Sequence, residues 1–357
     1  MTALAVAGVL TPQQAALTAA SIVAAQLPSG AIPWYAAGPL DPWDHVQGAM
    51  GLTVAGRHEE AVAAYDWSRS AQRADGTWAM AYDGDRVTDP HADANFGAYL
   101  ATGVWHHWRA TRDRRFVERL WPTVDAATEA VLRLQRDDGS IAWAVGEGGR
   151  PTDEAFLTGC ASMQLSMRCA VALADVVDDP RPQWLGPLTQ LRHAVREHPE
   201  AFCPKPTHAM DWYYPVLTGA LSGAEAHRHL AARWEEFVVA DLGVHCVSDH
   251  PWVTGGETAE LVLALAAIGR DADARALLGA MQHLREDDGS YWTGLVYADG
   301  KRWPVERTTW TGATVLLAVD AISGATPAAG LFRGDGLRAA DSHSDDEVDL
   351  CPCLLAS

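Results

Sequence analysis

Carboxylates recur at the predicted starts of apolar helices, and some of them are poorly explained as helix caps. Asp44 follows Asp41-Pro42-Trp43 and lies one turn inside its helix, so Asp41 and Asp44 cannot both be the cap. Glu257 follows two glycines in an otherwise largely apolar helix, where a carboxylate needs a partner or a catalytic role. Asp44 and Glu257 are therefore candidate catalytic carboxylates, with Asp41 orienting Asp44 or substituting for it.

These carboxylates suit general acid–base chemistry. A helix N-terminus lowers the pKa of a carboxyl group, whereas burial among aromatic rings raises it. One protonated and one ionised carboxyl can therefore share a site, as the inverting hydrolysis of a glycosidic bond requires, at a separation of about 6.5–9.5 Å. Which carboxylate is the acid stays open. Capping remains the alternative for any single Asp, and it is favoured for Asp89 and Asp153.

Aromatic residues accompany the carboxylates at the same helix starts. The chain has 15 tryptophans, and their rings could serve as platforms for sugar rings, although core packing explains any one of them. Acidic and basic side chains beside them could bind hydroxyl groups. The predicted substrate contacts are Trp43, His45, Asp211, Trp212, Tyr214, Trp252, Trp292, Glu306 and Arg307.

The elements that must position these residues follow from a 3.6-residue hydrophobic period. Short links at 55–57, 111–113 and 269–271 predict helices paired as antiparallel hairpins. The predicted helices span residues 11–26, 42–55, 57–72, 92–111, 115–135, 155–177, 184–197, 208–220, 222–237, 254–269, 271–284 and 307–322.

Alternate helices differ in character, which predicts an all-α (α/α)6 toroid. Residues 253–269 and 308–323 are apolar nearly all round, as expected of helices buried on every side. Residues 58–72 have one apolar stripe and a charged face. An inner ring of helices wrapped by an outer ring accounts for both kinds. The starts of all the inner helices would then lie at one end, around a funnel that holds the carboxylates and aromatic rings.

A repeated phrase ends several outer helices. An Asp-Gly-Ser/Thr sequence closes residues 72–78, 135–140 and 285–292, and each copy leads into a predicted β-hairpin at the funnel end. We expect one toroid domain over residues 1–332. Residues 333–357 lose the helical period and are acidic, so we expect a disordered tail.

Composition limits the possible partners. The chain has 46 acidic and 27 basic residues, a net charge of −19, which disfavours nucleic acids and anionic membranes but allows a neutral polysaccharide. No apolar run approaches the roughly 20 residues of a membrane span, and the N-terminus has no basic flank or cleavage site, so we expect a cytoplasmic protein. The scattered cysteines and histidines predict neither a metal site nor a cofactor.

The motifs resemble a known family. DPWDH, MDWYYPVLTG, PWVTGGETAELVLAL, DDGSYWTG and ERTTWTGA are similar to an actinobacterial group often labelled prenyltransferase, which includes the mycobacterial methylmannose-polysaccharide hydrolases. Residues 41–78 also resemble the opening of six-hairpin glycosidases. The resemblance covers roughly residues 10–332. It implies hydrolysis of an α-1,4-linked mannan that carries 3-O-methyl groups.

Two alternatives to hydrolysis remain, a terpenoid cyclase on the same toroid and a carbohydrate-binding toroid without activity. The chain has no D-x-D-D proton donor, and its only aspartate-rich candidate for magnesium is Asp345-Asp346-Glu347-Val348-Asp349 in the tail. It also departs from glucoamylase-like relatives, which have a Glu-Glu pair at their third inner helix. This chain has Asp153-Glu154 there, and only Glu306 could match their second catalytic glutamate.

Overall fold

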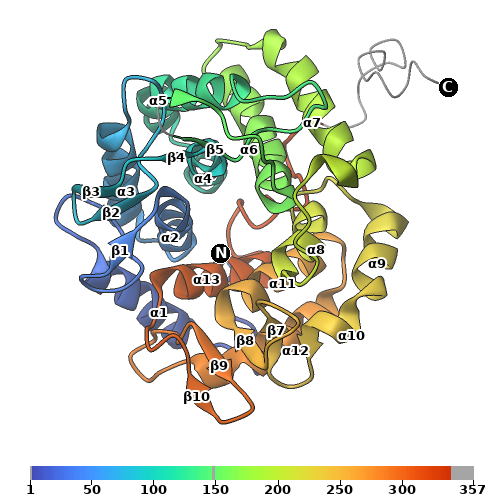
Figure 1. The fold of residues 1–357 in the computed structure, drawn as a ribbon. Helices are drawn as coiled ribbons and strands as arrows, with labels where there is room; N and C mark the ends of the chain where they lie inside the picture. The colour runs from blue at the N-terminus through green and yellow to red at the C-terminus, as the bar shows by residue number, and fades with distance from the viewer. Residues whose placement is uncertain (1, 147–148, 339–357) are drawn as a thin grey trace.

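A closed ring of helices surrounds the centre of the protein in the computed structural model, which describes residues 2–146 and 149–338 (Figure 1). Each inner helix contacts the next one along the ring, and the last contacts the first. In ring order, the inner helices are α2 (Pro42–Val54), α4 (Ala94–Thr111), α6 (Leu157–Val176), α8 (Ala209–Leu217), α11 (Gly255–Ala267) and α13 (Thr309–Ser323).

The outer helices lie against this ring and alternate with the inner ones along the chain. They agree with the predicted ranges, except that the helix expected over 222–237 is split at Arg233 and the helix expected over 271–284 ends as the 3₁₀ turn Met281–Leu284. The outer elements are α1 (Pro12–Ala25), α3 (His58–Ala71), α5 (Arg114–Leu132), α7 (Leu185–Glu197), α9 (Gly223–Ala232), α10 (Trp234–Phe237) and α12 (Asp271–Ala280). Short 3₁₀ turns at Pro182–Trp184 and Pro199–Ala201 flank α7.

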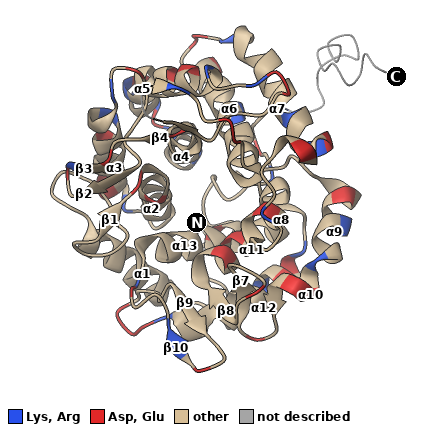
Figure 2. Ribbon diagram, in the orientation of Figure 1, with Lys and Arg blue, Asp and Glu red and all other residues tan. Residues whose placement is uncertain are grey.

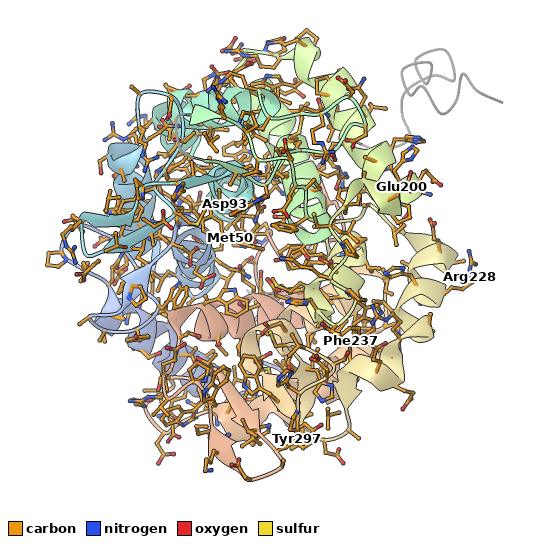
Figure 3. All side chains as sticks on the ribbon, in the orientation of Figure 1. Met50, Asp93, Glu200, Arg228, Phe237 and Tyr297 are labelled. Atoms are coloured by element: carbon orange, nitrogen blue, oxygen red, sulfur yellow. The ribbon has the colours of Figure 1, made fainter. Side chains whose placement is uncertain are left out.

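Small residues let the inner helices approach closely. A Cβ atom added to Gly51 of α2 would lie 2.7 Å from the Cα atom of Ala313 in α13, and one added to Gly256 would lie 2.1 Å from the ring of Trp310. Side chains such as the fully buried Met50 fill the interior of the ring, whereas Glu200 and Arg228 lie at the periphery (Figure 3). Most side chains of the inner helices are buried in the same way, so they form a packed core.

Short antiparallel strands cover the end of the ring where the inner helices begin. One sheet orders them β1-β2-β3, a second pairs β4 with β5, and a third has the order β10-β9-β8-β7-β6. Their bounds are β1 Pro39–Leu40, β2 Ala81–Asp83, β3 Arg86–Asp89, β4 Ala92–Asp93, β5 Ala144–Val145, β6 Val238–Val239, β7 Gly243–His245, β8 Trp252–Thr254, β9 Gly294–Val296 and β10 Lys301–Arg302. Strand β4 runs directly into α4 and β8 into α11, so the sheets fix the entry of these helices.

The repeated Asp-Gly phrase forms the same turn in each copy. In the second copy, the Asp138 carboxylate accepts hydrogen bonds from the backbone N–H and the hydroxyl of Ser140 at 2.9 and 2.5 Å. Gly139 has a φ of +82°, and a Cβ atom there would lie 2.6 Å from the carbonyl oxygen of Gln190. Glycine is therefore required both by the backbone angle and by the approach of the neighbouring outer helix.

The last described residues lie against the far ends of two inner helices. Arg338 forms an ion pair with Asp175 of α6 at 2.9 Å, and the Arg109 guanidinium of α4 donates to the backbone carbonyl of Asp335. Residues 333–338, which the sequence assigned to the tail, thus contact the toroid. Residues 339–357, including the acidic 345–349 run and the Cys-Pro-Cys sequence at 351–353, lie outside the described residues.

Charged side chains lie mainly on the outer helices and loops (Figure 2). The inner helices carry few charged side chains, and several of these are acidic residues at the helix starts. Of the helices that the structure describes, none has the length and apolar character that crossing a bilayer requires.

Candidate active site

A cleft opens where the inner helices begin, and it has two parts that meet at Trp43 and Met210. We call the larger part, of about 360 Å³, the aromatic arm. We call the smaller part, of about 200 Å³, the polar arm. The aromatic arm is lined by Trp34, Asp41, Trp43, Asp44, Phe96, Met210, Trp252, Thr254, Glu257, Thr293, Trp303, Pro304, Glu306, Thr308 and Trp310. The polar arm is lined by Trp43, Asp93, Asn95, Trp143, Phe156, Thr158, Gly159, Met163, Lys205, His208, Met210 and Asp211.

Asp41 is the N-cap of α2. Its Oδ1 atom accepts the backbone N–H groups of Trp43 and Asp44 at 2.8 and 2.9 Å, and its Oδ2 atom accepts the indole N–H of Trp34 at 2.6 Å. The carboxylate is 7% exposed and lines the aromatic arm, and burial raises its pKa. Since both oxygens already hold donors, Asp41 is suited to position Trp34 and Asp44.

Asp44 is half-buried in the first turn of α2 and lines the aromatic arm. Burial raises the pKa of its carboxyl group well above the ordinary value. The negative charges of Asp41, Glu260 and Glu257 raise it further. A carboxyl group in this environment holds its proton more tightly than an ordinary aspartate, which suits it to donate a proton to a leaving group.

Glu257 lies in the first turn of α11 and faces the same arm. Its side chain is only 6% exposed, and its Oε2 atom is buried without a hydrogen-bond partner among the described residues. The N-cap of this helix is Thr254, so capping does not explain the carboxylate. A buried carboxylate oxygen without a partner costs stability, and at the wall of a cleft it is a candidate for a functional role.

Glu260, one turn beyond Glu257, was missed by sequence reasoning. It is 1% exposed, and its carboxylate accepts the hydroxyl groups of Tyr213 at 2.5 Å and Tyr214 at 2.8 Å, together with the amide of Gln47 at 3.4 Å. Burial raises its pKa to about 7. The sequence does show a second glutamate three residues after Glu257 in an apolar helix, which could have indicated a buried carboxylate. Its tyrosine partners lie far away in the chain and could not be predicted from residue spacing.

The rings of the aromatic arm support one another. The Trp252 indole N–H donates to the carbonyl oxygen of Trp303 at 2.8 Å, and their rings meet edge-on at 4.7 Å between centroids. Trp310 donates to the side chain of Gln47 at 3.1 Å, which links the wall to the partner of Glu260. Trp43 packs against the edge of Tyr214. These contacts fix the ring planes before any ligand binds.

Two of the predicted substrate contacts are wrong, because the side chains lie in the core. His45 is fully buried, accepts the backbone N–H of Ile32 at its Nδ1 atom at 3.0 Å, and bonds the carbonyl oxygen of Ala64 through Nε2 at 2.9 Å. Trp212 is 1% exposed and stacks on Phe237 at 5.0 Å, between α8 and the outer layer. Helical rotation turns both side chains away from the cleft.

Three more predicted contacts lie beside the cleft and do not line it. Tyr214 is buried and binds Glu260 beneath Trp43. Trp292 donates to Glu286, and Arg307 pairs with Asp288 at 3.0 Å while its guanidinium covers the Trp292 ring. Glu306, by contrast, does line the aromatic arm, where burial raises its pKa.

The predicted caps of two inner helices also differ from the structure. Asp89 ends β3 and accepts the backbone N–H of His91, while the N-cap of α4 is Asp93. Asp153 and Glu154 are exposed and lie ahead of α6, whose N-cap is Phe156. The Asp153-Glu154 pair therefore contributes no carboxylate to either arm.

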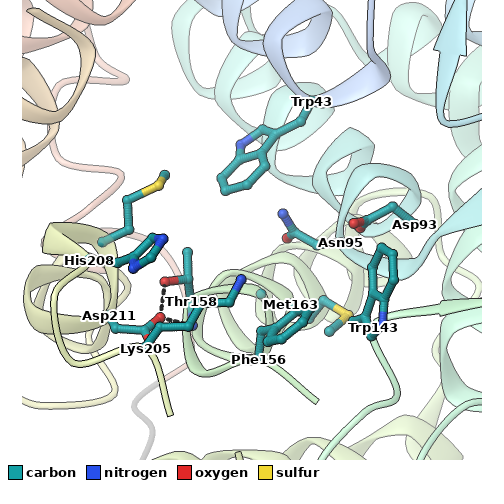
Figure 4. A pocket seen from close by; sticks show the side chains of 12 residues that line it. Trp43, Asp93, Asn95, Trp143, Phe156, Thr158, Met163, Lys205, His208 and Asp211 are labelled. Carbon is teal, nitrogen blue, oxygen red and sulfur yellow. Dashed lines mark hydrogen bonds between the residues drawn. The ribbon is translucent and has the colours of Figure 1, made fainter. Parts of the chain in front are cut away.

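The polar arm gathers hydrogen-bonding groups from α4, α6, α8 and the loop before α8 (Figure 4). Asp211 accepts the hydroxyl and backbone N–H of Thr158 at 2.6 and 3.3 Å, and burial raises its pKa. Burial also raises the pKa of Asp93 to about 7. Across the described ranges, no cluster of three or more histidine, cysteine, aspartate or glutamate side chains has a geometry that could hold a metal ion.

Comparison with solved structures identifies the architecture. A glycosidase in complex with glucose matches 88% of this chain and 97% of its own, with a TM-score of 0.70 and 16% identity. The GH63 mannosylglycerate hydrolase from Thermus thermophilus matches 85% of this chain and 99% of its own, with a TM-score of 0.66 and 14% identity. A D-mannose isomerase matches 86% of this chain and 96% of its own, with a TM-score of 0.65 and 10% identity. At these identities the likeness shows a shared fold, and the isomerase shows that this fold serves more than one reaction.

A curated relative is far more similar in sequence. The chain is 56% identical over 329 residues to the MMP endo-(1,4)-3-O-methyl-alpha-D-mannosidase of Mycolicibacterium hassiacum, with 92% of this chain and 91% of the relative covered. No family model matches the sequence.

Proposed function

The chain belongs to the family of the MMP endo-(1,4)-3-O-methyl-alpha-D-mannosidase and is a glycoside hydrolase, and we propose that its substrate is a 3-O-methylated α-1,4-mannan cut within the chain. The observation that supports this proposal most strongly is the joint placement of Asp44 and Glu257 in one arm walled by tryptophans. The cleft also continues past Trp43 into the polar arm. Sugar units could therefore bind on both sides of a cleaved bond, as endo action requires.

The environments of the two carboxylates support distinct roles. Asp44, whose pKa is raised by burial and by its acidic neighbours, would protonate the leaving glycosidic oxygen. Glu257, whose Oε2 atom has no partner among the described residues, would accept a proton from the attacking water. Water attack on the face opposite the leaving group inverts the anomeric centre. Asp41 would hold the backbone of Asp44 in place.

The aromatic arm suits a methylated sugar. Each O-methyl group replaces a hydroxyl donor with apolar surface, which favours contact with indole faces over hydrogen bonding. Trp43, Trp252, Trp303 and Trp310 would supply these faces, and Glu306 would bind a remaining hydroxyl. The substrate is neutral, so the net charge of −19 does not oppose its binding.

Two finer predictions from the sequence belong to this proposal. The closed inner ring, with outer helices alternating along the chain, supports an (α/α)6 toroid of six helical hairpins. Cys160, Cys169, Cys203 and Cys246 are free thiols, which supports a cytoplasmic location.

The decisive experiment incubates the purified protein with 3-O-methylated mannan and with other α-glycans, in the presence of EDTA, and identifies products by mass spectrometry. We expect methylated mannan to yield oligosaccharide fragments, and not single sugars, from the earliest time points. Release of single sugars alone would contradict endo action. Absence of cleavage of every glycan, with consumption of a prenyl diphosphate once magnesium is restored, would overturn the hydrolase assignment.

A further inference from the structure

Asn95 is an unusual side chain in the polar arm. It lies in the first turn of α4 and is 4% exposed, yet neither its amide oxygen nor its amide nitrogen has a hydrogen-bond partner among the described residues. Buried amide groups are normally paired, because desolvation without a partner costs stability. Asn95 lines the arm, and its amide is directed into the open space between Trp43 and Asp93 (Figure 4). The amide is therefore a buried donor and acceptor at the wall of the arm, and a ligand in the arm could supply the partners that it lacks.

Other polar groups face the same space. The Lys205 ammonium group lies 3.7 Å from the centre of the Phe156 ring and offers donors to the arm. Beside Lys205, Asp211 is held by Thr158 through one carboxylate oxygen, which leaves the second as an acceptor (Figure 4). The arm thus combines an amide, an ammonium group and a carboxylate around about 200 Å³.

This combination suits a neutral molecule with several hydroxyl groups. Asn95 can donate to one hydroxyl and accept from another, while Lys205 donates and Asp211 accepts. An anion would meet the carboxylates of Asp93 and Asp211. An apolar ligand would leave the Asn95 amide unpaired. The volume is of the order of one sugar ring, with the aromatic faces of Trp143 and Phe156 on the wall.

We propose that the polar arm is a subsite for an unmethylated sugar ring, recognised by Asn95, whereas the aromatic arm takes the methylated units. This inference rests on the proposed function. A methyl ether cannot donate to Asp211, and its methyl group would occupy the space in which Asn95 bonds a hydroxyl. Sites built to bond a hydroxyl discriminate strongly against analogues that lack it.

The position of Asp44 adds a consequence for cleavage. Asp44 follows Trp43, and Trp43 separates the two arms. A bond presented to Asp44 would therefore join a sugar in the polar arm to one in the aromatic arm. Cleavage is then expected where a less methylated unit adjoins methylated ones, and not at random along the polymer.

Binding can be measured without turnover in the Glu257→Gln background. By calorimetry, we expect Asn95→Ala to weaken binding of an unmethylated α-1,4-manno-oligosaccharide at least tenfold. Binding of a fully 3-O-methylated one should change less than twofold. Gln164→Ala is the matched control, because Gln164 is a buried amide whose polar atoms also have no partner among the described residues, and it lines neither arm. It should leave both affinities unchanged.

Two further readouts keep the inference testable. Removal of an unpaired buried amide should not lower the melting temperature, so Asn95→Ala is expected to remain folded. Wild-type enzyme given oligosaccharides with one unmethylated unit at known positions should cut beside that unit. Equal losses for both oligosaccharides in Asn95→Ala, or cuts independent of the unmethylated unit, would overturn the inference. Failure of the proposed function would instead appear as no cleavage of any mannan by the wild type.

Discussion

The Asp41 carboxylate accepts the backbone N–H of Asp44 at 2.9 Å, so the residue that the sequence offered as a substitute for Asp44 is the cap of the helix that carries it. The same carboxylate holds the indole of Trp34 through its other oxygen. One side chain therefore ties a candidate general acid to the aromatic wall. This relationship predicts that Asp41 acts on catalysis through position.

Replacing Asp41 with alanine should lower kcat about 100-fold, because small displacements of a catalytic group have effects of this size. The loss of the cap should cost about 1 kcal/mol of unfolding free energy. Thr11→Ala, which removes the cap of outer helix α1, is the control with a similar stability cost. Steady-state kinetics and thermal unfolding of both variants check this. Equal kcat values in both would show that Asp41 only caps.

Asp44→Asn and Glu257→Gln should each lower kcat by roughly 10²–10⁴-fold, the usual contribution of a general acid or base. Binding of an oligosaccharide should stay within threefold of wild type. Glu306→Gln is the comparison, because Glu306 lines the same arm but is assigned to substrate binding, so it should mainly raise KM. If Glu306→Gln abolished kcat while Glu257→Gln did not, the base would have to be reassigned.

Glu260→Gln should move the alkaline limb of the kcat profile to lower pH. The negative charge of Glu260 raises the pKa of Asp44, so its removal lets Asp44 lose its proton earlier as pH rises. Asp320→Asn is a matched control, since Asp320 is also a buried carboxylate, with a pKa raised to about 6, but lies outside both arms. A pH–rate series on both variants decides this, and identical shifts would argue for a general structural effect.

Trp303→Ala should raise KM for methylated mannan about tenfold, which corresponds to ~1.4 kcal/mol. Trp303 lines the aromatic arm with a 53% exposed side chain, so its removal exposes no core. Trp292→Ala removes a tryptophan that the sequence also placed at the mouth but that lines neither arm. It should leave KM nearly unchanged. A larger increase in KM for Trp292→Ala than for Trp303→Ala would indicate that the substrate binds along Trp292 and Arg307.

Acid should destabilise the protein through His45. Burial lowers the pKa of His45 from 6.5 to about 4, so between these values the unfolded chain binds the extra proton and stability falls with falling pH. At ~1.4 kcal/mol for each pKa unit, the loss from His45 approaches about 3 kcal/mol. Denaturant unfolding of His45→Gln across this range should show a flatter slope than wild type. The exposed His250→Gln should not differ.

Much of the fold is determined by local sequence. Residues 253–269 and 308–323 are apolar nearly all round, and this alone predicted that α11 and α13 are buried on every side. Asp-Gly phrases predicted the turns at Gly76, Gly139 and Gly289, because a left-handed backbone angle requires glycine there. Helix order and antiparallel pairing then predicted that Asp44 and Glu257 share one end.

What the sequence could not supply is the direction in which each side chain points and what surrounds it. His45 adjoins Asp44 in the chain, yet about 100° of helical rotation sends it into the core. The hydrogen bonds to the Glu260 carboxylate come from Tyr213, Tyr214 and Gln47, which lie 47, 46 and 213 residues away in the chain.

The sequence by itself therefore determined the periodic helices, the Asp-Gly turns and the residue types at one end of the ring. Tertiary structure decided which carboxylates face the cleft, because burial and pairing depend on contacts between residues far apart in the chain. Asn95 shows the difference most clearly. It looks ordinary in sequence, and its unpaired amide becomes visible only when α4, α6 and α8 enclose it.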